Sequence, residues 1–183
     1  MQICVYGASS NEIDPAYLQS GEALGLELAR RGHSLVFGGG QTGLMGAVAR
    51  GVVQGGGQLT GVAPRFFDQP GVLFDGCTQF IFTETMRERK SIMEEQADAF
   101  VMTPGGIGTF EEFYEILTLR QLGRHQKPIA MLNTKDYYAP LLQMQQRAVS
   151  QGFLQPECAN LFAAFEDPAA LLDYLENRSI PRG

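Results

Sequence analysis

The chain has 183 residues, of which 44% are hydrophobic and 19% are charged, and its formal net charge at pH 7 is −6. This size and composition predict one globular domain with a sizeable core, spanning residues 1–183. The acidic balance argues against a nucleic-acid backbone or an acidic membrane as partner, whereas a small phosphate ligand depends only on local donors.

We expect a cytoplasmic protein. The start of the chain carries no basic segment and no long apolar run, and no stretch approaches the ~18 apolar residues that a membrane span requires. Cys4, Cys77 and Cys158 are far apart and share no metal-binding or redox spacing. They are therefore expected to be buried free thiols, and we expect neither a metal site nor a cofactor.

Strands and helices alternate along the chain. The apolar runs predict strands at residues 2–6, 34–37, 58–62, 78–82, 99–102 and 127–133. Between and after them the patterns predict helices at 15–31, from the glycine segment to 53, at 86–93, 113–122 and 137–151, and from 168 to 176. The segment 63–76 is irregular and is interpreted as a flap or part of an interface, and 177–183 as a loose tail. The alternation predicts an α/β fold with a doubly wound parallel sheet and helices on both faces.

Three glycine- or serine-rich turns follow predicted strands, at residues 7–11, 38–46 and 104–109. In an open α/β sheet such turns gather at the carboxyl ends of the strands, where ligands bind. The sequence therefore predicts one ligand site built from all three turns.

The segment from Thr103 to Glu112 joins a buried strand to a helix through three glycines. Without side chains in the way, backbone N–H groups at the helix start can face a phosphate. The segment lacks the Gly-Lys-Ser/Thr of a triphosphate-binding loop, which favours a monophosphate held without metal. A plain glycine turn is the alternative.

Glu111 and Glu112 are expected in the first turn of that helix, where acids also stabilise the helix dipole by ~0.3–1 kcal/mol. A phosphate cradle needs no carboxylates, so their presence suggests chemistry beside the phosphate. The two side chains point about 100° apart around a helix, so at most one of them is expected to face the site.

The spacing Gly38-x-Gly40-x-x-Gly43 matches the dinucleotide fingerprint. An NAD site also needs an acidic residue at the end of the next strand, and residues 58–64 contain none. Tight packing of helix on sheet, or a turn that faces a different nucleotide, are the remaining interpretations.

The segment Arg87-Glu88-Arg89-Lys90 can be a solvated helix face, but Arg89 lies one turn from Met86 and from Met93, near the packed edge. An arginine there can reach into a site. His33 and His125 are expected at the surface, and Ser9 and Ser10 have no histidine and acid that would make either a nucleophile.

Several of these segments resemble one family. The run Pro104-Gly105-Gly106-Ile107-Gly108-Thr109-Phe110-Glu111-Glu112 matches PGGxGTxxE, Met86 to Lys90 resembles M-H-x-R-K, and Gly38 to Gly46 matches GGGxxGLMG. The chain thus resembles, over nearly its whole length, the LOG ("Lonely Guy") family of cytokinin riboside 5′-monophosphate phosphoribohydrolases, often labelled lysine decarboxylases. Arg87 stands where the family usually has His, which leaves base or partner preference open.

The resemblance implies a Rossmann-like fold, a homo-oligomer built from dimers, and an AMP-like nucleotide bound near the subunit interface. It implies that Arg89 and Glu112 are the catalytic pair. The other residues that it implies bind substrate are Ser9, Gly40, Thr42, Gly43, Met86, Lys90, Gly105, Gly106, Ile107, Gly108, Thr109 and Glu111.

The implied reaction is hydrolysis of a nucleoside 5′-monophosphate to free base and ribose 5-phosphate. Glu112 would stabilise positive charge on the ribose and activate water, while Glu111 is the second choice and would bind a ribose hydroxyl. Arg89 would either hold the phosphate or assist the departing base. A non-catalytic nucleotide- or cofactor-binding protein is the alternative function, and an NAD-dependent oxidoreductase is a third. Nothing in the sequence supports a decarboxylase, because the lysines lie in no recognisable cofactor setting.

Overall fold

The computed structural model describes residues 1–179, whose seven strands form one parallel sheet in the order β4-β3-β2-β1-β5-β6-β7. The strands are β1 (Gln2–Tyr6), β2 (Ser34–Phe37), β3 (Leu59–Pro64), β4 (Gln79–Thr83), β5 (Ala99–Met102), β6 (Ile129–Leu132) and β7 (Ala163–Phe165).

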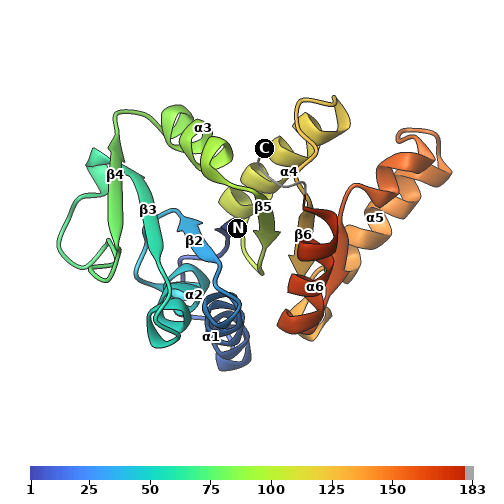
Figure 1. Ribbon diagram of the computed structural model, residues 1–183. Helices are drawn as coiled ribbons and strands as arrows, with labels where there is room; N and C mark the ends of the chain where they lie inside the picture. The colour runs from blue at the N-terminus through green and yellow to red at the C-terminus, as the bar shows by residue number, and fades with distance from the viewer. Residues whose placement is uncertain (180–183) are drawn as a thin grey trace.

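Helices cover both faces of this sheet (Figure 1). The helices are α1 (Pro15–Arg30), α2 (Gly43–Gln54), α3 (Met86–Gln96), α4 (Ile107–Gln121), α5 (Ala139–Ser150) and α6 (Pro168–Arg178). One core cluster joins the sheet to α1, α2 and α6, and a second joins it to α3, α4 and α5. The predicted α/β fold with a doubly wound parallel sheet is confirmed.

The helix starts follow capping chemistry that the sequence shows. Asp14 accepts a hydrogen bond from the N–H of Ala16 at 2.9 Å, with Pro15 as the first helical residue of α1. Asp167 does the same for α6 through the N–H of Ala170 at 3.0 Å. Such caps fix where each helix leaves its strand.

The order of the strands places a ligand crevice. The chain moves outward from β1 through β2 and β3 to β4, and then crosses back to β5 on the other side of β1. Adjacent loops at the carboxyl ends of β1 and β5 therefore diverge to opposite faces of the sheet. Such a switch point is where open α/β sheets bind ligands.

The structure differs from the expected elements at two helix ends and in one additional strand. Helix α4 begins at Ile107, six residues before the expected start at Phe113. The edge strand β7 was not predicted, because three residues without a β-branched side chain give too short a pattern. Helix α6 continues to Arg178, so residues 177 and 178 are not a loose tail, and the remainder of that segment after 179 lies outside the described residues.

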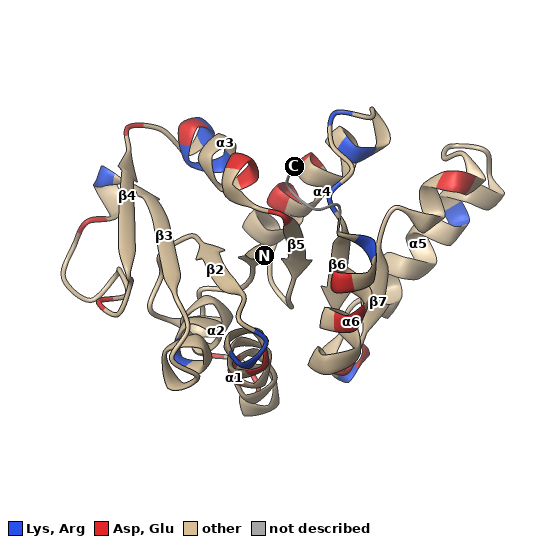
Figure 2. Cartoon of the chain, in the orientation of Figure 1, with Lys and Arg blue, Asp and Glu red and all other residues tan. Residues whose placement is uncertain are grey.

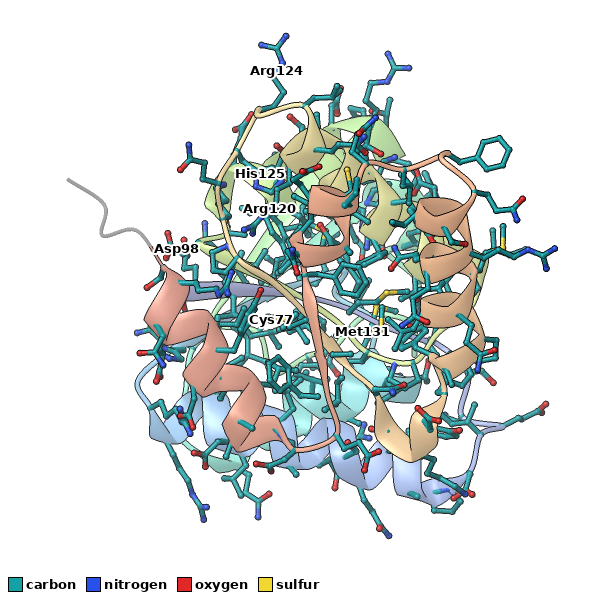
Figure 3. The ribbon with its side chains drawn as sticks, turned by 90° about the vertical axis from the view of Figure 1, so that its right-hand side faces the viewer. Cys77, Asp98, Arg120, Arg124, His125 and Met131 are labelled. Atoms are coloured by element: carbon teal, nitrogen blue, oxygen red, sulfur yellow. The ribbon has the colours of Figure 1, made fainter. Side chains whose placement is uncertain are left out.

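The buried and exposed side chains also differ from expectation. Of the cysteines only Cys4 is fully buried, while Cys77 and Cys158 are partly exposed, and all three are free. Both histidines, which were expected at the surface, are partly buried, and Figure 3 labels His125. His33 lies 2.8 Å from Glu176, and His125 donates from Nε2 to the carbonyl of Ile116 at 2.9 Å. Sequence patterns do not reveal either contact, because His33 and Glu176 are 143 residues apart in the chain and His125 reaches back past the end of α4 to Ile116.

Across residues 1–179 there is no helix with the length and apolar character that crossing a bilayer demands.

Candidate active site

The carboxyl end of β5 continues into a loop, Thr103 to Gly106, that leads into α4 and is called the anion-binding loop after its expected role. Gly105 has to be glycine, because a Cβ there would lie 2.1 Å from Oγ1 of Thr109. Within the part of the chain that the structure describes, the N–H groups of Gly106, Ile107 and Gly108 have no hydrogen-bond acceptor. These free donors, at the positive end of the helix dipole, make a site for an anion.

Arg89 and Glu112 form a buried ion pair beside this loop. Arg89 lies one turn into α3, and Nη1 of Arg89 is 2.6 Å from Oε1 of Glu112 on α4. The side chains are only 7% and 12% exposed. Figure 2 shows the mixed charges of α3 and the acidic residues of α4, the two helices that this pair connects. The sequence-based expectation that Arg89 points inward is met.

Gly38 makes room for the arginine. A Cβ at Gly38 would lie 2.2 Å from Nη2 of Arg89, closer than any real contact. On its other side the guanidinium donates from Nε to the carbonyl of Val62 at 3.1 Å. The end of β2, the end of β3 and the carboxylate of Glu112 together fix Arg89 in one orientation.

Glu112 titrates in an environment that opposes its charge. Burial raises the pKa of Glu112 above its ordinary value of 4.5, and the neighbouring Glu111 adds to the effect, while Arg89 and Lys90 lower the pKa. Burial is the largest of these causes, so the net direction is upward. A carboxylate with a raised pKa in a cavity is a candidate for charge stabilisation or base catalysis.

The second acid, Glu111, belongs to the surface of the helix. Its side chain is 53% exposed and pairs with Lys90, which also binds Glu115 at 2.9 Å. Neither Glu111 nor Lys90 lines the cavity. Of the two adjacent acids, only Glu112 faces the cavity.

The early start of α4 changes the interpretation of both acids. They are the fifth and sixth residues of the helix, because Gly106 is its N-cap and Ile107 its first residue. The expected position in the first turn was wrong, because the helix already begins at Ile107 and includes Gly108, despite the low helix propensity of glycine. The helix dipole acts mainly within the first turn, so it does not account for these carboxylates.

The second glycine turn, after β2, supplies another wall. Gly40 and Thr42 line the cavity, and Oγ1 of Thr42 donates to the carbonyl of Ser9 at 2.7 Å. Gly43 does not line it; its N–H donates to Oδ1 of Asn11 at 2.7 Å, and a Cβ would lie 2.4 Å from the carbonyl oxygen of Ala8. Gly43, the first residue of α2, therefore serves the close approach of this helix to the turn after β1, whereas the sequence suggested packing of helix on sheet or a turn that faces a nucleotide.

Residues 65–76, here called the strap, close the cavity from the side of β3 and β4. Leu73 pairs with Gly40 in an antiparallel bridge, and the N–H of Phe74 donates to the carbonyl of Gly39 at 2.8 Å. Phe67, Gly71, Val72 and Leu73 of the strap line the cavity. This segment, expected to be a flap or part of an interface, thus rests on the glycine turn and contributes an apolar wall.

The resulting cavity has a volume of about 570 Å³. It contains most of the residues that were expected to act on or bind substrate: Arg89, Glu112, Ser9, Gly40, Thr42, Met86, Gly106, Ile107, Gly108 and Thr109. Four expected residues do not line it: Gly43, Lys90, Gly105 and Glu111.

Sequence reasoning did not assign several residues that line the cavity: Gly7, Ala8, Ser10, Gly38, Met45 and the four strap residues. Gly7, Ala8 and Ser10 belong to a turn that the sequence does indicate. For the strap, the sequence indicated only an irregular segment. It could not place this segment at the cavity, because that position depends on tertiary contacts.

Comparisons with known proteins agree with the motifs. A family model described as possible lysine decarboxylase matches residues 45–175. The cytokinin riboside 5′-monophosphate phosphoribohydrolase LOG7 of Arabidopsis thaliana is 38% identical over 175 residues, covering 96% of this chain and 81% of that protein. The chain belongs to the LOG family. A relative from Rhodococcoides fascians, also named cytokinin riboside 5′-monophosphate phosphoribohydrolase, is 42% identical over 141 residues, covering 76% of this chain and 71% of that protein.

Solved structures agree on the architecture of this LOG-family chain. The molybdenum cofactor carrier protein of Chlamydomonas reinhardtii matches with a TM-score of 0.71 and 22% identity, covering 96% of each chain. The molybdenum cofactor binding protein of Rippkaea orientalis matches with a TM-score of 0.70 and 20% identity, covering 96% of this chain and 94% of that chain. At such low identity the likeness shows the Rossmann-like fold alone.

The lysines explain why a decarboxylase activity finds no support in this LOG-family site. A pyridoxal-dependent decarboxylase needs a lysine in the cavity to hold its cofactor as a Schiff base. The chain has three lysines. Lys90 pairs with acids of α4, Lys127 donates to the carbonyl of Glu94 at 2.6 Å, and Lys135 pairs with Asp14. None of them lines the cavity.

Proposed function

We propose that this protein hydrolyses the N-glycosidic bond of a nucleoside 5′-monophosphate. Water adds to C1′ of the ribose, the bond from C1′ to the base nitrogen breaks, and the base leaves with a proton. The products are the free base and ribose 5-phosphate. The observation that carries this proposal is the buried carboxylate of Glu112, held by Arg89 in the same cavity as the free N–H groups of α4.

The free N–H groups of Gly106, Ile107 and Gly108 are the proposed phosphate site. Binding the phosphate there holds the sugar at a fixed distance from Glu112, so that binding energy remote from the reacting bond orients the reaction. A nucleoside without phosphate should therefore be a poor substrate.

Glu112 is the proposed catalytic carboxylate. The bond to the base breaks through a state with positive charge on the ribose, and a nearby carboxylate stabilises that charge and can accept a proton from the attacking water. A raised pKa of Glu112 suits the second role, because a stronger base takes the proton more readily.

Arg89 is the proposed partner that orients Glu112. Its Nη1 bonds the carboxylate at 2.6 Å and its Nε bonds the carbonyl of Val62 at 3.1 Å. Two of the groups that donate from the guanidinium are thus already engaged. The sequence left two roles open for Arg89, holding the phosphate and assisting the departing base. The remaining N–H groups of Nη1 and Nη2 can serve either role. In both cases Arg89 also orients Glu112.

The strap is the proposed wall for the base. Phe67, Val72 and Leu73 contribute apolar side chains to the lining of the cavity. A purine presents a flat apolar face, and an N6 substituent would add more apolar area to be covered.

A homodimer is the proposed assembly. Ile107 lines the mouth of the cavity and is 87% exposed, and Tyr114 two turns further along α4 is exposed as well. A large apolar side chain beside a substrate cavity suits burial against a second subunit. Light scattering after size-exclusion chromatography measures the mass directly, and a monomer at assay concentration would contradict the assembly.

The activity is tested by incubating the protein with AMP, with N6-modified AMPs and with adenosine, followed by chromatography of free base and ribose 5-phosphate. We expect equal amounts of both products from monophosphates and little release from adenosine. No release from any monophosphate would overturn the proposal. Tight binding of AMP without turnover would instead identify the non-catalytic nucleotide-binding protein.

A further inference from the structure

The carbonyl groups of the anion-binding loop are held by hydrogen bonds from other segments. The hydroxyl of Tyr138 donates to the carbonyl of Thr103 at 2.7 Å, and that of Tyr137 donates to the carbonyl of Gly105 at 2.8 Å. Between them, the carbonyl of Pro104 accepts from the N–H of Ala8 at 3.1 Å. Each of the three carbonyls before the N-cap of α4 therefore has a donor.

One of these bonds determines the direction of a phosphate-binding donor. The carbonyl of Gly105 and the N–H of Gly106 belong to the same planar peptide group, in which they point in opposite directions. When Tyr137 holds the carbonyl on one side, the N–H of Gly106 is fixed on the other. That N–H is one of the three that have no acceptor among the described residues and that border the cavity.

The turn that carries the two tyrosines adopts an unfavourable backbone conformation. Lys135 and Asp136 have φ angles of 55° and 56°, the left-handed region that residues with a side chain seldom occupy. Asn133 at the end of β6 holds the turn, accepting from the N–H of Tyr138 at 2.7 Å and donating to Oδ1 of Asp136 at 2.9 Å. This turn places the hydroxyl groups of two consecutive tyrosines against the same loop.

Core packing alone does not account for both hydroxyls. Tyr138 is 1% exposed, and its ring packs edge-on against Phe110, so a phenylalanine could fill the same space. Tyr137 is 39% exposed, yet its hydroxyl also ends on a carbonyl of the loop. Burial raises the pKa of Tyr138, so that hydroxyl remains a protonated donor at neutral pH.

We propose that Tyr137 and Tyr138 are positioning residues that hold the anion-binding loop with its N–H groups directed at the phosphate. They touch neither the sugar nor the base, and they act through Gly105 and Thr103. The inference rests on the proposed function, because it assigns the loop to the 5′-phosphate of the substrate.

The test compares Tyr137→Phe with Tyr17→Phe. The ring of Tyr17 packs edge-on against that of Tyr137 at 5.9 Å, and its hydroxyl makes no hydrogen bond with the residues the structure describes, so it is a matched control. Calorimetry measures the affinity for ribose 5-phosphate and for adenine, which are products and do not react. Kinetics with AMP separate KM from kcat.

For Tyr137→Phe we expect roughly fivefold to tenfold weaker binding of ribose 5-phosphate, the contribution of one hydrogen bond. The affinity for adenine, the kcat and the melting temperature should stay near wild type, while KM for AMP rises by the same factor. Tyr17→Phe should leave every value unchanged. Tyr138→Phe should weaken ribose 5-phosphate binding in the same sense and also lower the melting temperature, because it leaves the buried carbonyl of Thr103 without its donor.

Ribose 5-phosphate binding within twofold of wild type in Tyr137→Phe would overturn the inference, as would an equal loss of affinity for ribose 5-phosphate and adenine. Binding of ribose 5-phosphate by a wild-type protein that turns over no nucleotide would refute the proposed function and leave this inference to be decided by the variants. A wild-type protein that binds neither ribose 5-phosphate nor AMP would overturn both.

Discussion

Replacing Glu112 by glutamine tests the proposed chemistry most directly. The substitution removes the negative charge of the cavity and retains the shape and one oxygen acceptor for Arg89. A unit charge about 4 Å from the developing positive charge is worth ~4 kcal/mol at an effective dielectric constant of ~20 and only ~1 kcal/mol in bulk water. The side chain of Glu112 is 12% exposed, so the first value applies. That energy corresponds to a loss of roughly 10³-fold in kcat.

The assay is the release of base and ribose 5-phosphate from AMP at saturating substrate, together with the dissociation constant for AMP. We expect binding to persist, or to tighten slightly, because the variant removes an anion that repels the phosphate. The melting temperature has to be recorded alongside, since Arg89 loses its charged partner and an unpaired buried charge destabilises a fold.

Glu111→Gln is the matched control. Glu111 is the neighbouring acid on the same helix, but it is half exposed and pairs with Lys90 outside the cavity. Its substitution should change kcat by less than about threefold, in keeping with the small energies of exposed ion pairs. If Glu112→Gln reduced kcat by less than about tenfold, which is ~1.4 kcal/mol, Glu112 would not carry the reaction. A larger effect of Glu111→Gln than of Glu112→Gln would reverse the assignment.

Three further predictions follow from contacts in the cavity. Because burial raises the pKa of Glu112 above 4.5, the acidic limb of kcat/KM against pH should lie above 4.5, and a limb at or below 4.5 would contradict this. The folded state binds this proton more tightly than the unfolded chain does. The free energy of unfolding should therefore fall as the pH rises from 4.5 through the pKa of Glu112 in the folded state. Gly38→Ala puts a Cβ 2.2 Å from Nη2 of Arg89 and should lower kcat/KM by about 10²-fold through displacement of the pair, so near-normal activity would disprove the role of Gly38. Leu73→Ala in the strap should raise KM for AMP by about tenfold, or ~1.4 kcal/mol, and leave inhibition by ribose 5-phosphate unchanged; an equal effect on both would place the strap against the sugar phosphate instead.

The parts of the fold that depend on local chemistry could be predicted from the sequence. The apolar runs gave six of the seven strands that the structure describes, and the Asp-Pro pairs at 14–15 and 167–168 gave two helix starts. The convergence of three turns on one site also follows from a general rule of parallel sheets. For these features neighbouring residues contain all the information that is needed.

The start of α4 could not be predicted in the same way. Two glycines in Gly106-Ile107-Gly108 suggest a loop by propensity, yet Gly108 is helical. Phe113, Ile116 and Leu117 are buried against the sheet, and their packing extends the helix backward to where its N–H groups meet the cavity. Tertiary packing outweighed the local preference, and it moved both acids out of the first turn.

The contacts made by Gly38 and by the strap lie beyond any sequence pattern. Gly38 is adjacent to Arg89 only because β2 and β3 are paired and α3 crosses their ends. The strap reaches the cavity through its bridge between Leu73 and Gly40, which joins segments far apart in the chain. Such residues become visible as functional candidates only when the strand order is known.

The geometry of α4 resolves the conflict between an anion site and a nearby carboxylate. Ile107 and Glu112 are five residues apart on one helix, which is about 7.5 Å along its axis at ~1.5 Å per residue. At that separation the repulsion between phosphate and carboxylate is roughly half that at 4 Å, and Arg89 offsets part of it from 2.6 Å away. A ribose phosphate bound with its phosphate on the first turn thus extends along the helix toward the acid. In the proposed complex the donors would bind the end of the substrate that does not react, and the carboxylate would meet the sugar, where positive charge develops. Under the proposed function, one helix with glycines at its start and an acid in its second turn therefore supplies both the anchor and the catalytic group.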